Sequence, residues 1–191
     1  MRKILIVIDM QKDFVSGILG NAETKAIVPK VCEKIRNWVE DHILYTLDAH
    51  EEPFYSTTEE GKRVPLHCVY CEDGYYLEDD IQAALMDYED ARDDQEKAGR
   101  IDSVVKETFG AVDELPYMIE KCMPEHPFQI HMVGVCTDIC VISNALVLRS
   151  AFPKVEIYVD ASCCAGTTPE NHKAALAVMK ANCINVINEE W

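Results

Sequence analysis

The sequence has little positive charge and no long hydrophobic run. Its 18 lysine and arginine residues are outnumbered by 34 aspartate and glutamate residues, so the formal net charge is −16. Nucleic acid and anionic membrane surfaces bind basic patches, which such a composition does not favour. No segment approaches the roughly 20 apolar residues that span a bilayer. We therefore expect neither nucleic acid nor a membrane as a partner.

The opening stretch also departs from the pattern of a secretory signal. In the opening stretch MRKILIVIDMQKDF, two cations precede an apolar run of only about five residues, shorter than the roughly 7–15 of a signal core, and Asp9 closes it. This pattern predicts a cytoplasmic protein. The nine cysteines are then expected to be free thiols, most of them buried packing residues, rather than a disulfide framework.

Short apolar, β-branched runs alternate along the chain with stretches of helical periodicity. The runs predict six strands, at 3–9, 43–50, 103–110, 128–135, 155–161 and 184–188. The stretches predict helices at 21–42, 112–125, 138–152 and 169–183, the first with Ile27, Val31, Ile35 and Val39 at helical spacing. Strand alternating with helix favours right-handed βαβ units. The predicted fold class is therefore α/β, a three-layer α/β/α arrangement with a central, mostly parallel six-stranded sheet.

The length suits a single domain over residues 1–191, with an elaboration at about 51–100. Residues 51–76 have weak periodicity and many turn formers, which predicts a long loop of the kind that is usually functional or disordered. Residues 77–100 are strongly charged and helical in composition. They predict a solvated surface helix, which could also cover a pocket or meet a partner subunit.

Charged side chains stand where several predicted strands end. Asp9, Asp48, His50 and Lys106 all fall at or just after the carboxyl end of such a strand, as does the segment around Gly134. Ligands of open α/β sheets bind at this edge. A buried, isolated charge is costly, so Asp9 and Lys106 are expected either in a structural ion pair or in a catalytic group.

The segment GVCTDIC, residues 134–140, joins a predicted strand to a predicted helix. Thr137 is a good N-cap, which would place Cys140 in the first helical turn, where the helix dipole and unpaired N–H groups favour a reactive thiolate. Cys136 would lie in the turn, with its backbone N–H available to a substrate oxygen. The alternative for either cysteine is a buried packing residue.

Two histidines and two acids have the spacing of a metal site. Asp48 and His50 lie on one side of an extended strand end, and His67 follows from the long loop, with Glu60 seven residues before it. One aspartate and two histidines, completed by a glutamate or water, suit Zn²⁺, Fe²⁺ or Mn²⁺. A second possibility is a zinc site of His67, Cys68 and Cys71, although it lacks the further cysteine pair of a zinc finger.

Five motifs together resemble the isochorismatase-like cysteine hydrolases, and most closely the nicotinamidases. They occur in matching order and spacing from residue 3 to about 180 and read ILIVIDMQKDF, TLDAHEE, VPLHC, VVKETF and GVCTDICV. The resemblance implies the Rossmann-like fold of that family. It also implies that Cys140 is the nucleophile, that Asp9 takes the thiol proton and that Lys106 completes the triad.

The same resemblance implies further site residues. A cis peptide bond is expected between Val135 and Cys136, with the backbone N–H groups of Cys136 and Cys140 as the oxyanion hole. Phe14 matches an aromatic residue that packs against the substrate ring. The implied cofactor is one divalent ion, zinc before iron or manganese, and its ligands by resemblance are Asp48, His50 and His67, with Glu60 or its neighbour Glu59 as a possible fourth.

The implied activity is hydrolysis of nicotinamide to nicotinate and ammonia through a thioester on Cys140, with a place in NAD salvage. Two segments depart from the family pattern, VYCEDGYY after His67–Cys68 and KETFGAVDEL at Lys106. They keep two alternatives open: an amidase of the same family for another small amide or carbamoyl compound, and a non-catalytic protein of the same fold that binds a small molecule or metal. The expected partner is a small-molecule amide, and the sequence leaves a homo-oligomer open.

Overall fold

A wholly parallel sheet of six strands forms the centre of the computed structural model, which describes residues 1–40, 42–93, 100–125 and 127–189. The strand order is β3-β2-β1-β4-β5-β6, and every neighbouring pair is parallel. The strands are β1 Arg2–Ile8, β2 His42–Asp48, β3 Arg100–Lys106, β4 Phe128–Val135, β5 Glu156–Ala165 and β6 Asn185–Ile187. The predicted fold class is confirmed.

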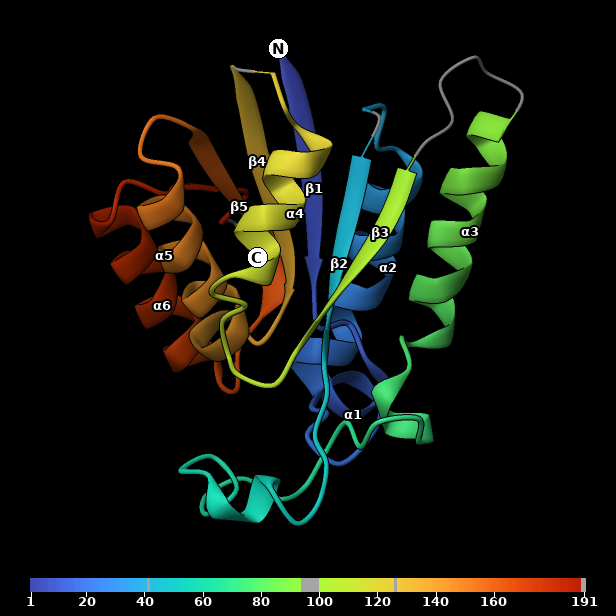
Figure 1. The fold of residues 1–191 in the computed structure, drawn as a ribbon, viewed down its shortest axis with the longest axis vertical. Coiled ribbons are helices and arrows are strands. Elements are labelled where there is room, and N and C mark those ends of the chain that lie inside the picture. The colour runs from blue at the N-terminus through green and yellow to red at the C-terminus, as the bar shows by residue number, and fades with distance from the viewer. Residues whose placement is uncertain (41, 94–99, 126, 190–191) are drawn as a thin grey trace.

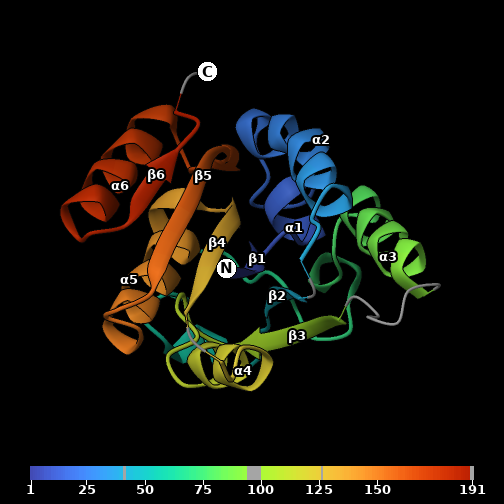
Figure 2. The ribbon, with the colours of Figure 1, turned by 90° about the horizontal axis from the view of Figure 1, so that it is seen from above.

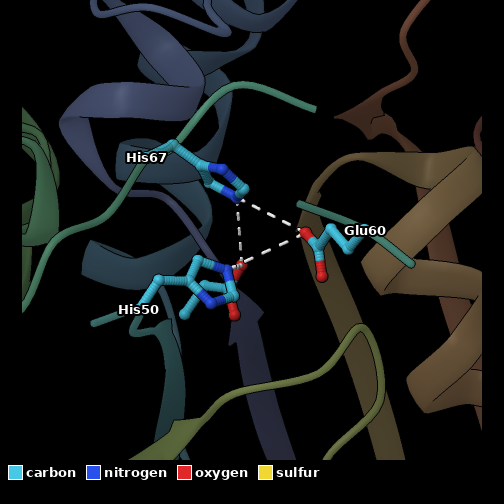
Figure 3. A group of neighbouring side chains, drawn as sticks. His50, Glu60 and His67 are labelled. Atoms are coloured by element: carbon cyan, nitrogen blue, oxygen red, sulfur yellow. Dashed lines mark hydrogen bonds and ion pairs between the residues drawn. The ribbon is translucent and has the colours of Figure 1, made fainter. Parts of the chain in front are cut away.

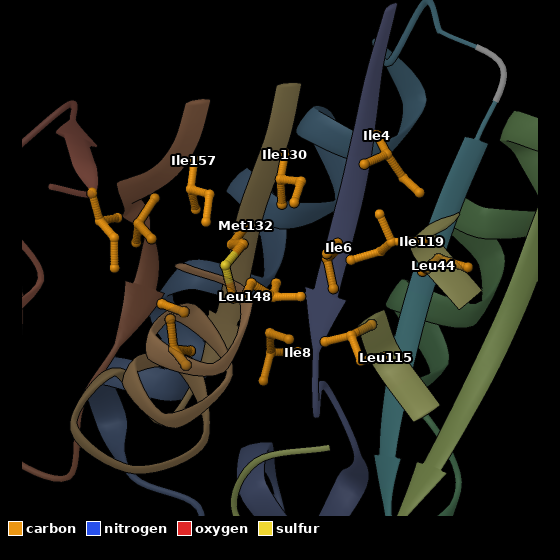
Figure 4. Close-up of a cluster of buried hydrophobic side chains, with 14 of the residues drawn as sticks. Ile4, Ile6, Ile8, Leu44, Leu115, Ile119, Ile130, Met132, Leu148 and Ile157 are labelled. Carbon is orange, nitrogen blue, oxygen red and sulfur yellow. The ribbon is translucent and has the colours of Figure 1, made fainter. Parts of the chain in front are cut away.

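Helices cover both faces of the sheet (Figures 1 and 2). One face carries α1 Lys12–Val15, α2 Ala22–Arg36 and α3 Asp79–Asp93, and the other carries α4 Glu114–Cys122, α5 Ile142–Ala151 and α6 Pro169–Ala181. Because β1 is central, its alternate side chains enter both cores. Ile4, Ile6 and Ile8 pack toward α4 and α5 (Figure 4), whereas Leu5 and Val7 pack toward α2 and α3.

Helix α2 begins at a capping box and ends earlier than predicted. The Asn21 side chain accepts a hydrogen bond from the Thr24 N–H at 2.8 Å, and the Thr24 hydroxyl accepts one from the Asn21 N–H at 3.0 Å. The helix ends at Arg36, so the prediction of helix to residue 42 was wrong. Val39, which keeps the helical spacing, is 81% exposed. Beyond the helix, the Trp38 indole N–H donates to the His42 carbonyl and holds the connection to β2.

The strand ends differ from the predictions by a few residues. Strands β2 and β3 stop at Asp48 and Lys106, which are partners in the parallel register, so the two side chains meet at one edge. Strand β5 continues to Ala165, beyond the predicted end at 161, because its pairing with β4 resumes after a register shift between Met132 and Gly134.

The elaboration consists of a loop and one long helix. Residues 51–76 form turns with two short 3₁₀ segments, Tyr55–Thr57 and Asp73–Tyr75, as the loop prediction requires. Helix α3 packs against α2, and its apolar face of Ile81, Ala84, Leu85 and Tyr88 is buried. The prediction of a solvated surface helix therefore holds for only one face of α3, and residues 94–99 lie outside the described part. No helix among the described residues has the length and apolar character to cross a membrane.

Candidate active site

Lys106 is the centre of a buried cluster at the carboxyl edge of the sheet. Its Nζ lies 2.8 Å from Asp9 Oδ2, 3.2 Å from Asp48 Oδ1 and 3.7 Å from Cys140 Sγ. All four side chains are buried, with exposed fractions of 4% or less. The structure thus brings together the three residues predicted as a catalytic group, Asp9, Lys106 and Cys140.

The ends of β1, β2 and β3 position the acids and the lysine. Asp9 follows directly on β1 and has a positive φ of 47°. Its N–H donates to the Thr46 hydroxyl on β2 at 3.1 Å, and that hydroxyl donates to Asp9 Oδ1. The register of β2 and β3 sets Asp48 beside Lys106. Each charge therefore gains a partner that offsets the cost of its burial.

Cys140 lies in a π-helical turn, Thr137–Val141, which leads from β4 into α5. The peptide bond from Val135 to Cys136 is cis, as the resemblance implied. Gly134, with a φ of 122°, passes so close to β1 that a Cβ there would lie 2.1 Å from the Ile8 carbonyl oxygen, which excludes a side chain.

The prediction that Thr137 caps this helix was wrong. Cys136 occupies the cap position, and its carbonyl accepts hydrogen bonds from the N–H groups of Ile139 and Val141, both at 3.0 Å. The Thr137 hydroxyl instead forms a 2.8 Å hydrogen bond with His172 Nδ1 on α6. A partner from another layer of the fold thus replaces the local capping bond.

Further hydrogen bonds fix the Cys140 turn. The Asp138 carboxylate accepts bonds from the Thr167 N–H at 2.8 Å and from the Thr167 hydroxyl. The Asn144 side chain donates to the Cys140 carbonyl at 2.8 Å and accepts from the Ala111 N–H at 2.9 Å. The turn is therefore tied both to the β5–α6 connection and to the loop after β3, and no sequence motif indicated these ties.

The charge state of the cluster differs from the expectation of a ready thiolate. Burial raises the pKa of the Cys140 thiol well above its ordinary value; Lys106 acts in the opposite direction, and the Asp9 and Asp48 carboxylates add to the rise. Burial also raises the pKa of Asp9, opposed by Lys106. Burial alone would lower the pKa of Lys106, but Asp9, Cys140 and Asp48 raise it well above normal. Burial thus favours the neutral form of the Cys140 thiol, and the neighbouring acids favour the charged form of Lys106.

A second group of side chains shares Asp48 with this cluster. Its other members, His50, Glu60 and His67, point toward one another in Figure 3. Asp48 Oδ2 lies 3.2 Å from His50 Nε2 and 3.4 Å from His67 Nε2. Glu60 Oε1 lies 3.8 Å and 3.7 Å from the same two nitrogens. These four residues are the predicted ligand set. Glu59, by contrast, forms surface ion pairs with Lys62 and Arg63.

The donor set fits a divalent ion such as zinc. Ligand atoms bonded to tetrahedral zinc at about 2.1 Å would stand about 3.4 Å apart, close to the 3.2–3.8 Å separations measured from Asp48 and Glu60 to the two imidazoles. His67 Nδ1 lies 2.9 Å from the Pro65 carbonyl, and a proton donated there leaves the Nε2 lone pair facing the group. Burial would raise the pKa of Asp48, but Lys106, His50 and His67 hold it well below its usual range.

The second zinc possibility finds no support in the structure. Within the described ranges, the only facing group of three or more metal-ligating side chains is the one that contains Asp48. Cys68 is buried with its thiol directed at the Gly74 carbonyl, 3.8 Å away, and Cys71 is exposed. The prediction of a site formed by His67, Cys68 and Cys71 was therefore wrong, because the chain turns between the two cysteines and separates them.

Several residues outside the metal-ligand group contact its members or the chain next to them. The Gln11 side chain donates to the Asp48 carbonyl at 2.8 Å and accepts from the Asp48 N–H at 2.7 Å. The Asp13 carboxylate accepts a 2.7 Å bond from the Cys68 N–H, which fixes the chain next to His67. Both residues belong to the motif DMQKDF, but only the fold reveals their partners. Tyr55, whose ring lies 4.4 Å from that of His50, had no signal in the sequence.

Phe14 and a small cavity complete the surroundings. Phe14 is buried, and its ring meets that of His67 edge-on at 5.2 Å. A cavity of about 260 Å³ adjoins His50 and is lined by Ala49, His50, Glu51, Phe54, Tyr55, Thr58 and Glu107. Its lining residues include two exposed glutamates and no lysine or arginine. The space beside His50 thus suits a small molecule without negative charge.

Comparisons with known proteins give consistent results. A family model described as an isochorismatase domain matches residues 3–190. A pyrazinamidase of Pyrococcus horikoshii, solved in complex with zinc, superposes with a TM-score of 0.75 at 29% identity over 98% of this chain and 99% of its own.

Two more distant structures share the fold. A nicotinamidase from Bacillus subtilis has a TM-score of 0.74 at 22% identity, over 98% of this chain and 100% of its own. An N-carbamoylsarcosine amidase from Thermoplasma acidophilum has a TM-score of 0.72 at 20% identity, over 100% of this chain and 98% of its own. A comparison with curated protein sequences finds no match.

Proposed function

Since this chain belongs to the isochorismatase family, we propose that it is a metal-containing cysteine amidohydrolase that converts nicotinamide and water to nicotinate and ammonia. The observation that carries the proposal is the contact of Lys106 with Asp9, Asp48 and Cys140, which joins a nucleophile and a base to the metal-ligand group. The pyrazinamidase and nicotinamidase structures among its structural relatives support a ring-bearing amide as the substrate.

The proposed first stage is formation of a thioester. Cys140 Sγ attacks the amide carbon while Asp9 takes the thiol proton, and we place the two events together because burial favours the neutral thiol. Lys106 keeps its positive charge and stabilises the charge that develops on sulfur. The backbone N–H groups of Cys136 and Cys140 are proposed to donate to the oxyanion; a lost donor of this kind costs on the order of 100-fold in rate.

Asp9 then returns the proton to the leaving nitrogen, and ammonia departs as the carbonyl re-forms. Water attacks the thioester with Asp9 as its base, and Cys140 leaves with a proton to regenerate the thiol. Asp48, His50, Glu60 and His67 would hold the divalent ion, which supplies a Lewis-acid anchor for the ring nitrogen of the substrate when it is bound. Phe14, packed against His67, would contact the ring.

The cavity beside His50 argues for a neutral amide over a carboxylate-bearing carbamoyl compound. Glu51 and Glu107 would repel a substrate carboxylate, and the buried cation of the site, Lys106, is already paired with Asp9 and Asp48. The departures in VYCEDGYY and KETFGAVDEL keep another small neutral amide as the second candidate. The close approach of Lys106 to Asp9 and Cys140 argues against a non-catalytic binding protein.

We expect the zinc-loaded protein to release ammonia from nicotinamide and to prefer it to N-carbamoylglycine by about 10-fold or more in kcat/KM, because each exposed like charge costs up to about 1 kcal/mol. Ammonia release and nicotinate formation are measured in parallel, with pyrazinamide as a second neutral amide. A folded, metal-loaded protein that turns over none of these amides contradicts the proposal. A preference for N-carbamoylglycine would replace nicotinamide by a carbamoyl substrate.

The metal-ligand assignment predicts a contrast between His67 and Glu59. His67→Ala removes one nitrogen of the donor set and should lower zinc affinity by at least about 100-fold. Loss of a residue that only hydrogen-bonds to a metal ligand already lowers metal affinity by about 10–100-fold. Glu59→Ala removes only surface ion pairs and should bind zinc as the unaltered protein does. Zinc content per chain after dialysis against a buffered zinc concentration measures both. Full zinc content in His67→Ala would contradict the assignment.

A further inference from the structure

Thr46 makes two hydrogen bonds with the same residue, Asp9. Thr46 lies on β2, two positions before Asp48, and is completely buried. Its hydroxyl oxygen accepts the Asp9 N–H at 3.1 Å, and its hydroxyl proton is donated to Asp9 Oδ1. A hydroxyl has only one proton to donate, and Thr46 donates it to the residue from which it also accepts a bond. Both bonds therefore hold Asp9.

The backbone at Asp9 needs such a partner. The paired register of β1 with β2 ends at Val7 and Tyr45, and the chain then turns away through the positive φ of Asp9. A buried backbone N–H that no longer pairs with the neighbouring strand destabilises the fold by about 1–3 kcal/mol if it finds no other acceptor. The Thr46 hydroxyl supplies that acceptor and, through its proton, also sets the rotation of the Asp9 carboxyl group.

The two oxygens of Asp9 therefore have different surroundings. Oδ1 accepts from Thr46, whereas Oδ2 lies 2.8 Å from Lys106 Nζ, which in turn lies 3.7 Å from Cys140 Sγ. A carboxyl oxygen that takes up a proton keeps one lone pair as an acceptor, so neither contact is lost when Asp9 is protonated. The Thr46 bond to Oδ1 therefore acts by holding the rotation of the carboxyl group, with Oδ2 on the side of Lys106.

From this geometry we propose that Thr46 is a positioning residue that holds the Asp9 carboxyl group with Oδ2 toward Lys106, so that Oδ2 accepts the thiol proton of Cys140. The inference rests on the proposed function, in which Asp9 accepts that proton. The S–H bond of Cys140 breaks as the O–H bond forms on Oδ2, and the electron pair left on sulfur forms the bond to the amide carbon. Lys106 stays protonated throughout.

The test compares Thr46→Val, which has nearly the same shape without the hydroxyl, with Thr46→Ser, which keeps it. In the zinc-loaded full chain, Thr46→Val should lower kcat for nicotinamide by about 10- to 100-fold, the scale of a misplaced catalytic group. KM should stay within about 2-fold, because Thr46 is not proposed to touch the substrate. Thr46→Ser should restore kcat to within about 3-fold of the unaltered protein. Zinc content is measured for each variant.

A second readout does not depend on the substrate. The rate at which iodoacetamide alkylates Cys140, followed by peptide mass spectrometry against the other eight cysteines, should fall at least about 5-fold in Thr46→Val and recover in Thr46→Ser. If Thr46→Val does not fold, Thr46→Ala takes its place with the same expectations.

The outcomes separate this inference from the proposed function. If the unaltered protein releases no ammonia, the proposed function is contradicted. The alkylation rates then test the role of Thr46 by themselves. The inference is overturned if the folded Val or Ala variant keeps kcat and the alkylation rate within about 2-fold, or if Thr46→Ser falls as far as Thr46→Val.

Discussion

Cys140→Ala should abolish amide hydrolysis, whereas Cys136→Ala should keep most of it. The two cysteines are a matched pair, four residues apart, with exposed fractions of 3% and 7%. The thiol of Cys140 lies 3.7 Å from Lys106 Nζ and interacts with Asp9. Burial raises the pKa of both thiols, that of Cys136 to about 12, so the contact with Lys106, and not the pKa, sets Cys140 apart. The proposed contribution of Cys136 is its backbone N–H, which alanine retains.

We expect Cys140→Ala to lose about 10⁴-fold or more in kcat, the scale on which removal of a covalent nucleophile acts. Cys136→Ala should stay within about 5-fold and lose about 1 kcal/mol of stability from the small cavity left by sulfur. Ammonia release and thermal unfolding are measured for both variants. Acid quenching of the unaltered protein with nicotinamide should yield an acyl adduct on the Cys140 peptide. An equally inactive, folded Cys136→Ala would show that its sulfur is required.

The sheet was predictable because buried parallel strands are almost continuously apolar. Strand β4 was predicted at its observed bounds, Phe128–Val135. The end of α2 was not, because Val39 continues the helical spacing after the chain has left the helix. Hydrophobic periodicity indicates which residues suit a buried helix face. The end of the helix depends instead on the path of residues 37–40 toward the start of β2, which periodicity does not predict.

The acids and the lysine of the site were predictable for a related reason. Asp9, Asp48 and Lys106 each interrupt an apolar run at its carboxyl end, where a charge needs a partner. Thr46, Tyr55 and His172 carried no such signal, since their partners come from other strands and loops. Hydrogen bonds of this kind depend on the tertiary fold and leave no local pattern in the sequence.

Two opposing effects act on the pKa of the Cys140 thiol. A helix N-terminus stabilises a nearby negative charge by about 0.3–1 kcal/mol, up to about 2 kcal/mol in partly buried sites. Complete burial shifts a pKa by up to about 3–5 units, equivalent to several kcal/mol. Burial therefore outweighs the helix start, and the pKa of Cys140 rises instead of falling. In the proposed mechanism the thiolate therefore forms during attack, with Asp9 as the proton acceptor.

The variants Asp9→Asn and Lys106→Met should separate chemistry from folding. Asp9→Asn has the same shape, keeps an oxygen for the Thr46 hydroxyl and leaves Lys106 paired with Asp48. Its amide N–H₂ then faces Lys106 Nζ in place of Oδ2, so it should fold with a loss of about 3 kcal/mol, the lower end for a broken buried pair. It should lose about 10²–10⁴-fold in kcat, because no base takes the thiol proton.

Lys106→Met should lower both the stability of the fold and kcat. It leaves Asp9 and Asp48 as two buried carboxylates without their shared cation, and a broken buried pair costs about 3–5 kcal/mol. Because the pKa of Asp48 in the folded state is depressed, its contribution to stability is present above the unfolded pKa and lost as pH falls. With Lys106 removed, the folded-state pKa of Asp48 should rise toward its unfolded value, so this contribution should become smaller and its loss should be complete at a higher pH.

The two changes should not add in the double variant. Asp9→Asn/Lys106→Met carries one carboxylate fewer than Lys106→Met, so it should be the more stable of these two, while its kcat should be no lower than that of the worse single variant, since the residues act as a unit. Urea unfolding and ammonia release are measured on the unaltered protein, the two single variants and the double variant. They give the coupling between Asp9 and Lys106 in stability and in kcat. Additive losses in both measurements would show that Asp9 and Lys106 act independently and would contradict a shared proton-transfer group.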